Sequence, residues 1–319
     1  MRGPAGVGAR LVVVAMLVAA CEGADGGGSG DRSGRLDVVA GFYPLAEAAE
    51  RVGGEHVAVA NLTPAGAEPH DLELDPQQTR QVLEADVAVV MGRGFQPAVE
   101  RVAQEREAPT LRVLRELPIP RRGVVAEQEH EEGEEHADEE HAEGALDPHV
   151  WLDPRLMEVL VEETAEALSE TDPAHEDDYR ANAAAYDAQI ERLDAAYERA
   201  LRRCDRRVLV TSHEAFGWLA ERYDLRERGI VGLSPEAEPD PRRLAQLAQL
   251  VRRTGTTTVF TETLVSARIG RTLAREAGVR TAVLNPLEGL TDEQLARGED
   301  YVSVMRDNLR LLERSLGCG

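Results

Sequence analysis

The sequence predicts an α/β protein of two lobes, each built on a parallel sheet, joined by one long rigid helix. Short apolar stretches alternate with amphipathic stretches of helical length in both halves of the chain, which is typical of parallel sheets. A helical stretch at residues 173–204 separates the two halves. At 319 residues the chain is also long enough for two ordinary domains.

The first half, residues 36–172, carries the alternation after a short polar leader. The apolar run LDVVA reads as a buried strand, and Asp75 with Pro76 forms the N-cap and first-turn pair of a helix. Glycines and prolines mark the loop NLTPAGAEPH, which ends at His70. We expect strands at 36–40, 56–62, 86–91 and 110–114, with helices at 44–52, 76–85 and 96–105.

The linking stretch at 173–204 has a single apolar face. Its large apolar side chains recur at steps of 7, 4, 3, 4 and 4 residues: Tyr179, Tyr186, Ile190, Leu193, Tyr197 and Leu201. At a rise of 1.5 Å per residue the helix would span ~45 Å, more than the width of one small domain. We interpret it as a rigid backbone joining two lobes; a long helix within one domain is the alternative that the pattern leaves open.

The second half, residues 205–319, repeats the alternation. We expect strands at 207–211, 225–231, 257–260 and 280–284, and helices at 214–223, 241–254, 266–277 and 299–316. Ligands of open α/β sheets bind beyond the carboxyl ends of the strands. The sequence therefore predicts a site in the cleft between the two lobes.

The N-terminus has the features of an export signal. Two arginines precede the apolar run LVVVAMLVAA at residues 11–20, which is too short to span a bilayer as a final helix. The run ends in VAAC and resembles a bacterial lipobox, so we expect residues 1–20 to be a signal peptide and Cys21 to carry lipid. Residues 21–35 fit a flexible tether. We therefore expect an extracytoplasmic protein anchored to the cell membrane, with a chance cysteine after an ordinary signal peptide as the alternative.

Residues 127–146 are an acidic, histidine-rich segment within the first lobe. Residues 127–143 hold ten acidic side chains and no basic one, together with His130, His136 and His141. Without apolar periodicity the segment should be a mobile loop. Imidazole and carboxylate attract divalent transition metals, so we expect auxiliary metal capture, with a solvated acidic linker as the alternative. The net charge of −23 argues against nucleic acid as a partner.

Two cysteines remain beyond the signal segment, Cys204 and Cys318. In an oxidising compartment they could form one disulfide joining the start and the end of the second half. Neither belongs to a zinc-type cysteine pair, so we do not expect them to bind metal.

Three other histidines each fall in a connection between expected elements that is able to project into one cleft. His70 ends the loop after the second strand, His149 lies in DPHVWLD, and His213 follows the strand VLVT. Glu288, in NPLE after the last strand, is a fourth candidate. Each histidine alone is more often structural than a ligand. Three neutral imidazoles with one carboxylate, however, make a closed four-coordinate site suited to Zn²⁺.

These motifs together resemble one family. GAEPHD, the acidic insert, DPHVWLDP, TSHEAFGWLA, TETLVSAR and LNPLEGLTDE occur in the order found in the metal-binding lipoproteins of bacterial ABC importers for zinc and manganese, over residues 36–316. The resemblance implies two lobes bridged by a rigid helix, with metal between them, and His70, His149 and His213 as the first three ligands. Many relatives carry Asp where this chain has Asn285, and a neutral amide is a poor replacement for that carboxylate. We therefore expect Glu288 as the fourth ligand, with water or Glu68 as the fallback, and Asn285 as a possible fallback or a neighbour of the ligands.

The resemblance implies a monomeric protein that captures Zn²⁺ and delivers it to an ABC permease and its ATPase. Histidine at the third ligand position favours zinc over manganese, because oxygen ligands suit manganese. A secreted zinc hydrolase is the alternative from another class: Glu68 or Glu214 could act as a base, but no HExxH is present. A surface adhesin or zinc store could coexist with transport.

Overall fold

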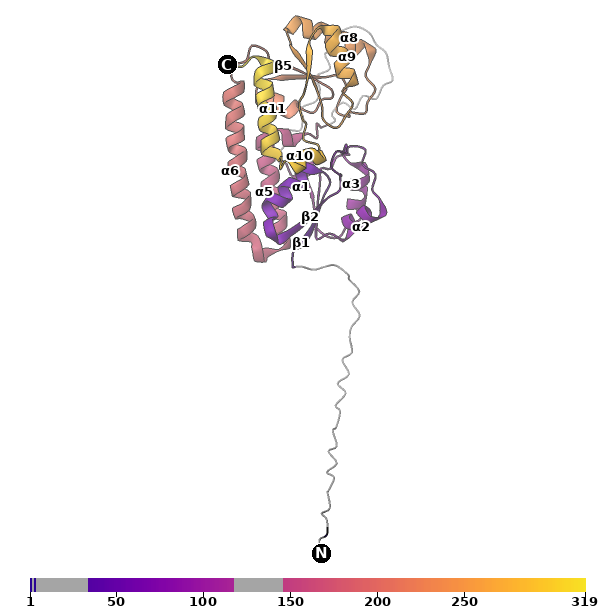
Figure 1. Ribbon diagram of the computed structural model, residues 1–319, viewed down its shortest axis with the longest axis vertical. Helices are drawn as coiled ribbons and strands as arrows, with labels where there is room; N and C mark the ends of the chain where they lie inside the picture. Colours follow the sequence, from indigo (N-terminus) through magenta and orange to yellow (C-terminus); the bar gives the residue numbers. More distant parts are fainter. Residues whose placement is uncertain (2, 4–33, 118–145) are drawn as a thin grey trace. The chain divides into compact units, whose positions relative to one another are not determined.

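In the computed structural model, residues 1, 3, 34–117 and 146–319 are described. Every strand among these residues lies in one of two four-stranded parallel sheets, as the alternation predicts (Figure 1). Each sheet has the same order, with the first strand of its lobe second in the sheet: β2-β1-β3-β4 and β6-β5-β7-β8. The prediction of a two-lobed parallel α/β fold is confirmed.

The first lobe has four strands and four helices before residue 118. Its strands are β1 (Leu36–Ala40), β2 (Val57–Asn61), β3 (Val87–Val90) and β4 (Thr110–Arg112), and its helices are α1 (Tyr43–Gly53), α2 (Pro76–Glu84), α3 (Pro97–Ala103) and α4 (Val113–Glu116). Asp75 caps α2 by accepting hydrogen bonds from the N–H groups of Gln77 and Gln78. The expected strand at 110–114 ends early, because Val113 begins the turn of α4.

The second lobe has the strands β5 (Val208–Thr211), β6 (Arg226–Gly229), β7 (Thr258–Thr261) and β8 (Arg280–Val283), and the helices α7 (Gly217–Arg222), α8 (Pro241–Thr254), α9 (Arg268–Ala277), α10 (Asp292–Ala296) and α11 (Tyr301–Leu316). Helix α7 starts three residues later than expected. Residues before it form a turn, in which the N–H of His213 donates to the Glu262 side chain and the N–H of Glu214 donates to Gly232.

Two long helices, α5 (Pro154–Thr171) and α6 (Glu176–Leu201), pack against each other, and α6 runs alongside both lobes (Figure 1). The apolar face predicted for α6 is buried, with Tyr197 fully inside. The Tyr197 hydroxyl donates to the carbonyl of Met305 in α11, and the Tyr186 hydroxyl donates to Glu47 of α1. Helix α6 therefore contacts elements of both lobes, and one continuous apolar core runs through them.

Helix α5 is absent from the sequence-based expectation, although its start is marked. Asp153 accepts the backbone N–H of Arg155 and Pro154 occupies the first turn, a common arrangement at helix N-termini. The Sγ atoms of Cys204 and Cys318 lie 1.99 Å apart, at bonding distance, just beyond the ends of α6 and α11. None of the helices among the described residues is long and apolar enough to cross a membrane.

Candidate metal centre

His70 lies in the loop between β2 and α2. Its backbone N–H donates to both carboxylate oxygens of Glu68, at 3.0 and 3.1 Å, which fixes the turn that carries the ring. The preceding carbonyl, of Pro69, accepts a hydrogen bond from the buried Gln96 side chain. The imidazole ring packs against Phe95, with ring centroids 4.4 Å apart. Both backbone and ring are therefore held by elements of the first lobe.

His149 immediately precedes a short 3₁₀ turn at Val150–Leu152. The Oδ1 atom of Asp147 accepts two hydrogen bonds from His149, one from its backbone N–H at 2.9 Å and one from ring Nδ1 at 2.6 Å. The segment is tied to the second lobe by indole N–H groups. Trp151 donates to the carbonyl of Pro286, and Trp218 donates to the carbonyl of Asp147.

His213 follows β5 and is held by the end of the neighbouring strand. Glu262, just after β7, accepts the backbone N–H of His213 at 3.0 Å and ring Nδ1 at 2.7 Å. As at His149, one carboxylate bonds both the main chain and the ring of a single histidine. This fixes the ring and leaves its Nε2 pointing away from the carboxylate.

Glu288 lies in the turn after β8. The backbone reverses at Leu287, whose φ of 58° is in the left-handed region, and the Asn285 side chain accepts the Leu287 N–H. Asn308 of α11 fixes this turn from behind: its amide accepts from the Asn285 N–H and donates to the Asn285 carbonyl. The Asn285 side chain thus makes a hydrogen bond within the loop that carries Glu288.

These four side chains converge on one point. Their candidate ligand atoms all lie within 4.8 Å of one another. The Nε2 atoms of His70, His149 and His213 lie 3.1, 3.2 and 3.3 Å from Oε1 of Glu288. Three of the four side chains are at most 1% exposed, and that of His70 is 11% exposed. The structure therefore brings together residues that are 79, 64 and 75 positions apart in the sequence.

One buried oxygen at this point has no partner. Oε2 of Glu288 makes no hydrogen bond although it is inaccessible to solvent. An orphaned buried carboxylate oxygen is costly, since it has lost its hydration without compensation. A divalent cation bound between this carboxylate and the three Nε2 atoms would remove that cost, and three nitrogens with one oxygen suit zinc.

The carboxylates around the cluster favour protonated imidazoles in the metal-free protein. Burial lowers the pKa of His149, but the charge of Asp147 and hydrogen bonds to Asp147 and Glu288 outweigh it and raise the pKa to about 9. The pKa of His213 also lies well above its usual value, since Glu262 and Glu288 outweigh burial there. Burial raises the pKa of Glu288, yet the three imidazoles hold it well below its usual range. A cation entering this site must displace protons.

The other residues singled out in the sequence have different positions. Glu68 lies beside the cluster, 3.7 Å from Nε2 of His70. His130, His136, His141 and Cys21 lie outside the described residues. His56 and His175, for which the sequence gives no supporting context, stack on each other with ring centroids 3.9 Å apart. Each donates to a carboxylate, of Asp178 and Asp172 respectively, at the base of α6.

The sequence-based reasoning missed two residues, Asp147 and Glu262. The first could have been suspected from DPH, because an aspartate two residues before a ligand can reach both its N–H and its ring. Glu262 gave a weaker signal: it ends a strand, but only the pairing of β5 and β7 brings it to His213. Their placement depends on tertiary structure more than on spacing.

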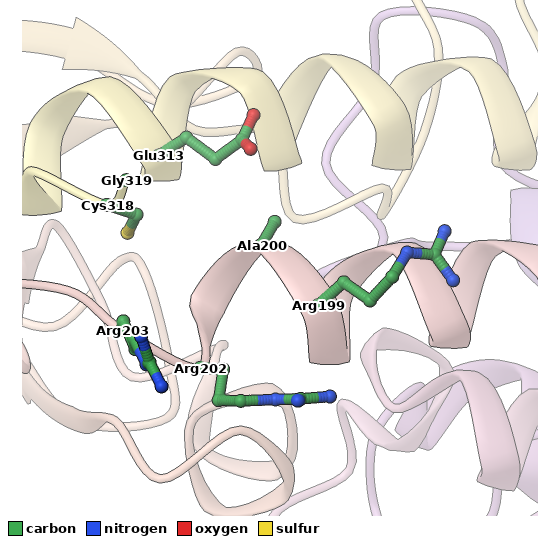
Figure 2. Close-up of a pocket in the computed structure, with 7 residues that line it drawn as sticks. All are labelled: Arg199, Ala200, Arg202, Arg203, Glu313, Cys318 and Gly319. Carbon is green, nitrogen blue, oxygen red and sulfur yellow. The ribbon is translucent and has the colours of Figure 1, made fainter.

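A separate hollow lies at the far ends of α6 and α11. Figure 2 shows three arginines on the α6 side, Arg199, Arg202 and Arg203, with Glu313 projecting from α11 and Cys318 between them. It contains no histidine, and its charged groups are mainly cationic. This hollow is therefore unsuited to a metal cation.

Comparison with known proteins identifies the family. The model of the zinc-uptake complex component A periplasmic family, ZnuA, matches residues 38–315. The chain belongs to this family. The high-affinity zinc uptake system protein ZnuA of Bacillus subtilis is 33% identical over 305 residues, covering 94% of both chains. The zinc-binding protein AdcA of Streptococcus pyogenes is 35% identical over 286 residues, and the match spans 88% of this chain but 56% of AdcA, about half its length.

Solved structures agree with the fold. The Zn(II)-bound ZnuA-like domain of Streptococcus pneumoniae AdcA has a TM-score of 0.72 and 33% identity, covering 89% of this chain and 99% of that domain. The laminin-binding protein of Streptococcus agalactiae, described as bifunctional with adhesin and metal-transporting activity, has a TM-score of 0.75 and 27% identity, covering 88% of this chain and 99% of that protein. Membership of this family agrees with the resemblance seen in the sequence.

Proposed function

We propose that this chain captures Zn²⁺ outside the cytoplasmic membrane and delivers it to an ABC permease driven by its ATPase. The observation that carries the proposal is the convergence of three imidazole Nε2 atoms and one carboxylate on one buried point. The names of its relatives, zinc-binding and zinc-uptake proteins, support the choice of metal. His70, His149, His213 and Glu288 are the proposed ligands, and Glu68 is a neighbour that could assist.

Capture replaces protons by metal. Asp147 and Glu262 hold the Nδ1 sides of two rings, so the opposite nitrogens face the cation. The four proposed ligands fill a tetrahedral zinc shell and leave no position for a reacting water, which favours a binding role over hydrolysis. The secreted hydrolase alternative requires turnover of an ester or amide by the zinc-loaded protein, and a hydrolytic assay tests it directly.

Manganese is the second candidate cargo. Carboxylate and carbonyl oxygens suit Mn²⁺, whereas three nitrogens with one oxygen suit Zn²⁺, so the donor set favours zinc. Elemental analysis of the purified protein, followed by competitive titration with both metals, tests this choice. Wild type should bind one Zn²⁺ tightly and Glu288→Gln should bind it much more weakly. Equal zinc affinity in the two proteins would remove Glu288 from the ligand set.

The surroundings of the site extend the proposal. Lipid on Cys21 would keep the protein at the membrane, near its permease, since two or more acyl chains anchor stably. An oxidised Cys204–Cys318 pair would join the ends of α6 and α11 in that compartment.

Because α6 packs on both lobes, metal loading should reorder loops more than it swings the lobes. Scattering from metal-free and loaded protein would test this: a large change in the radius of gyration contradicts it.

A further inference from the structure

The three imidazoles of the site are held in two different ways. His149 and His213 each give their Nδ1–H to a buried carboxylate, that of Asp147 or Glu262. The same two carboxylates accept the backbone N–H of the same histidines. Both carboxylate residues are at most 5% exposed. Each of these rings is therefore fixed in rotamer and tautomer before any cation arrives.

His70 lacks such a support among the described residues. Glu68 accepts only its backbone N–H, and the polar contacts of the ring are both at Nε2, 3.1 Å from Glu288 and 3.7 Å from Glu68. Its side chain is 11% exposed, whereas those of His149 and His213 are 0% exposed. The neighbouring Glu68 side chain is 15% exposed. The His70 edge is thus where solvent comes closest to the ligand atoms.

We propose that Asp147 and Glu262 are positioning residues that make His149 and His213 the permanent part of the site, and that the cation enters and leaves past His70. This deepens the proposed function and rests on it. A carboxylate at Nδ1 directs the Nε2 lone pair to the metal and increases its basicity, and removing such a partner typically costs about 10–100-fold in metal affinity. A ring without that partner can rotate away without leaving a buried carboxylate unpaired.

The order of ligand loss follows from this difference. Turning the ring of His149 or His213 away from the cation would break its Nδ1 hydrogen bond to a buried carboxylate, whereas turning the His70 ring away breaks no such bond among the described residues. Dissociation should therefore start at His70 and leave a cation held by two imidazoles and Glu288. A permease that pulls the loop of His70 would release the cation from its weakest side.

The positioning roles are tested with Asp147→Asn and Glu262→Gln, which keep side-chain size but remove the charge. Each should raise the Zn²⁺ dissociation constant about 10–100-fold, while Co²⁺ bound at saturation keeps the visible spectrum of a four-coordinate ion. Glu47→Gln is the matched control: Glu47 is a buried carboxylate that contacts Tyr43, Arg51 and Tyr186 and none of the proposed ligands. Affinity within twofold of wild type in both variants would overturn the positioning roles.

The exit side is tested by chemical rescue. In His70→Ala, free imidazole from solution should enter the vacated position and slow Zn²⁺ dissociation into a chelator, measured by stopped flow. The native His149 side chain is 0% exposed, so in His149→Ala free imidazole should not reach the vacated position and should have no such effect. Rescue of both variants alike, or of His149→Ala alone, or of neither, would overturn the exit path. Circular dichroism of each variant establishes that it is folded, and His149→Gln with His70→Gln replaces any alanine variant that is not.

Tight one-to-one zinc binding by wild type separates the two proposals. If wild type does not bind zinc tightly, the proposed function fails. If it does, and the variants behave like the Glu47→Gln control, only the inference fails.

Discussion

The two lobes have the same strand order but position the proposed ligands differently. The second lobe offers His213 and Glu288 from short turns at strand ends, each fixed by another element of that lobe: Glu262 holds the first, and Asn308 holds the turn of the second. The first lobe offers His70 from the long connection between β2 and α2, and offers His149 from the segment before α5. In the second lobe, both proposed ligands are held by other residues of that lobe. In the first lobe, the His70 ring has no carboxylate at Nδ1 among the described residues.

This difference shows that equal topology does not give equal rigidity at a site. A turn at a strand end inherits the order of the sheet, and a carboxylate on the next strand can reach it. A ligand in a longer connection needs its own local hydrogen bonds, as Asp147 provides for His149. The His149 ring thus has a carboxylate at Nδ1 like that of His213, and the His70 ring of the same lobe has none among the described residues.

The largest expected loss of zinc affinity is that of His213→Ala, in the second lobe. His213→Ala removes one of four ligands and leaves the buried Glu262 carboxylate unpaired. If a zinc site contributes about 10–16 kcal/mol, one ligand contributes roughly 3 kcal/mol or more, over 100-fold in affinity. Competitive chelator titration should show a larger loss for His213→Ala than for His70→Ala. Equal losses would contradict the difference between the lobes.

The second prediction concerns protons on the two fixed rings. Because Asp147 raises the pKa of His149 to about 9 in the metal-free protein, the ring keeps its proton at neutral pH and zinc must displace it. Zinc affinity should therefore increase as pH rises from 7 towards about 9, by up to ~10-fold per unit for each displaced proton, and decrease as pH falls. Calorimetry in buffers of different ionisation enthalpy counts the protons released. An affinity that is constant above pH 6.5 would contradict it.

A smaller loss of zinc affinity is expected from Asn308→Ala, which removes the contacts of α11 with the turn before Glu288. Asn308→Ala leaves the buried N–H and carbonyl of Asn285 without partners, which should lower the free energy of unfolding by about 1–3 kcal/mol or more. Zinc affinity should also decrease, but less than in Glu288→Gln, because the carboxylate remains present. Thermal unfolding and titration measure both. Arg306→Ala, on the exposed side of the same helix, is the control and should change neither.

The smallest effect on affinity is expected from the acidic segment. If His130, His136 and His141 capture zinc transiently and raise its concentration near the cleft, deleting residues 127–143 should slow loading at low zinc without weakening the tight site. Stopped-flow loading and equilibrium titration separate the two effects. Loss of tight binding in the deletion variant would assign this segment to the site itself.

Much of this architecture could be predicted from local patterns. Alternating strands and helices identify the two parallel sheets, and histidines at the expected strand ends suggest a common site. Helix α5 was also predictable, since Asp153 and Pro154 mark its start. The contacts that position the proposed ligands could not be predicted from local sequence, because they depend on packing between strands and helices that are distant in the chain. Glu262 reaches His213 only because β7 lies beside β5, and the roles of Asn285 and Glu288 depend on Asn308.

The chain contains only two tryptophans, and both lie beside the proposed metal centre. Trp151 has its ring centroid 5.2 Å from that of His149, and the indole of Trp218 donates to the carbonyl of Asp147. All indole fluorescence of this protein therefore originates within contact distance of the ligand segment. Emission intensity offers a label-free optical readout of cargo loading, with no background from tryptophans elsewhere in the fold.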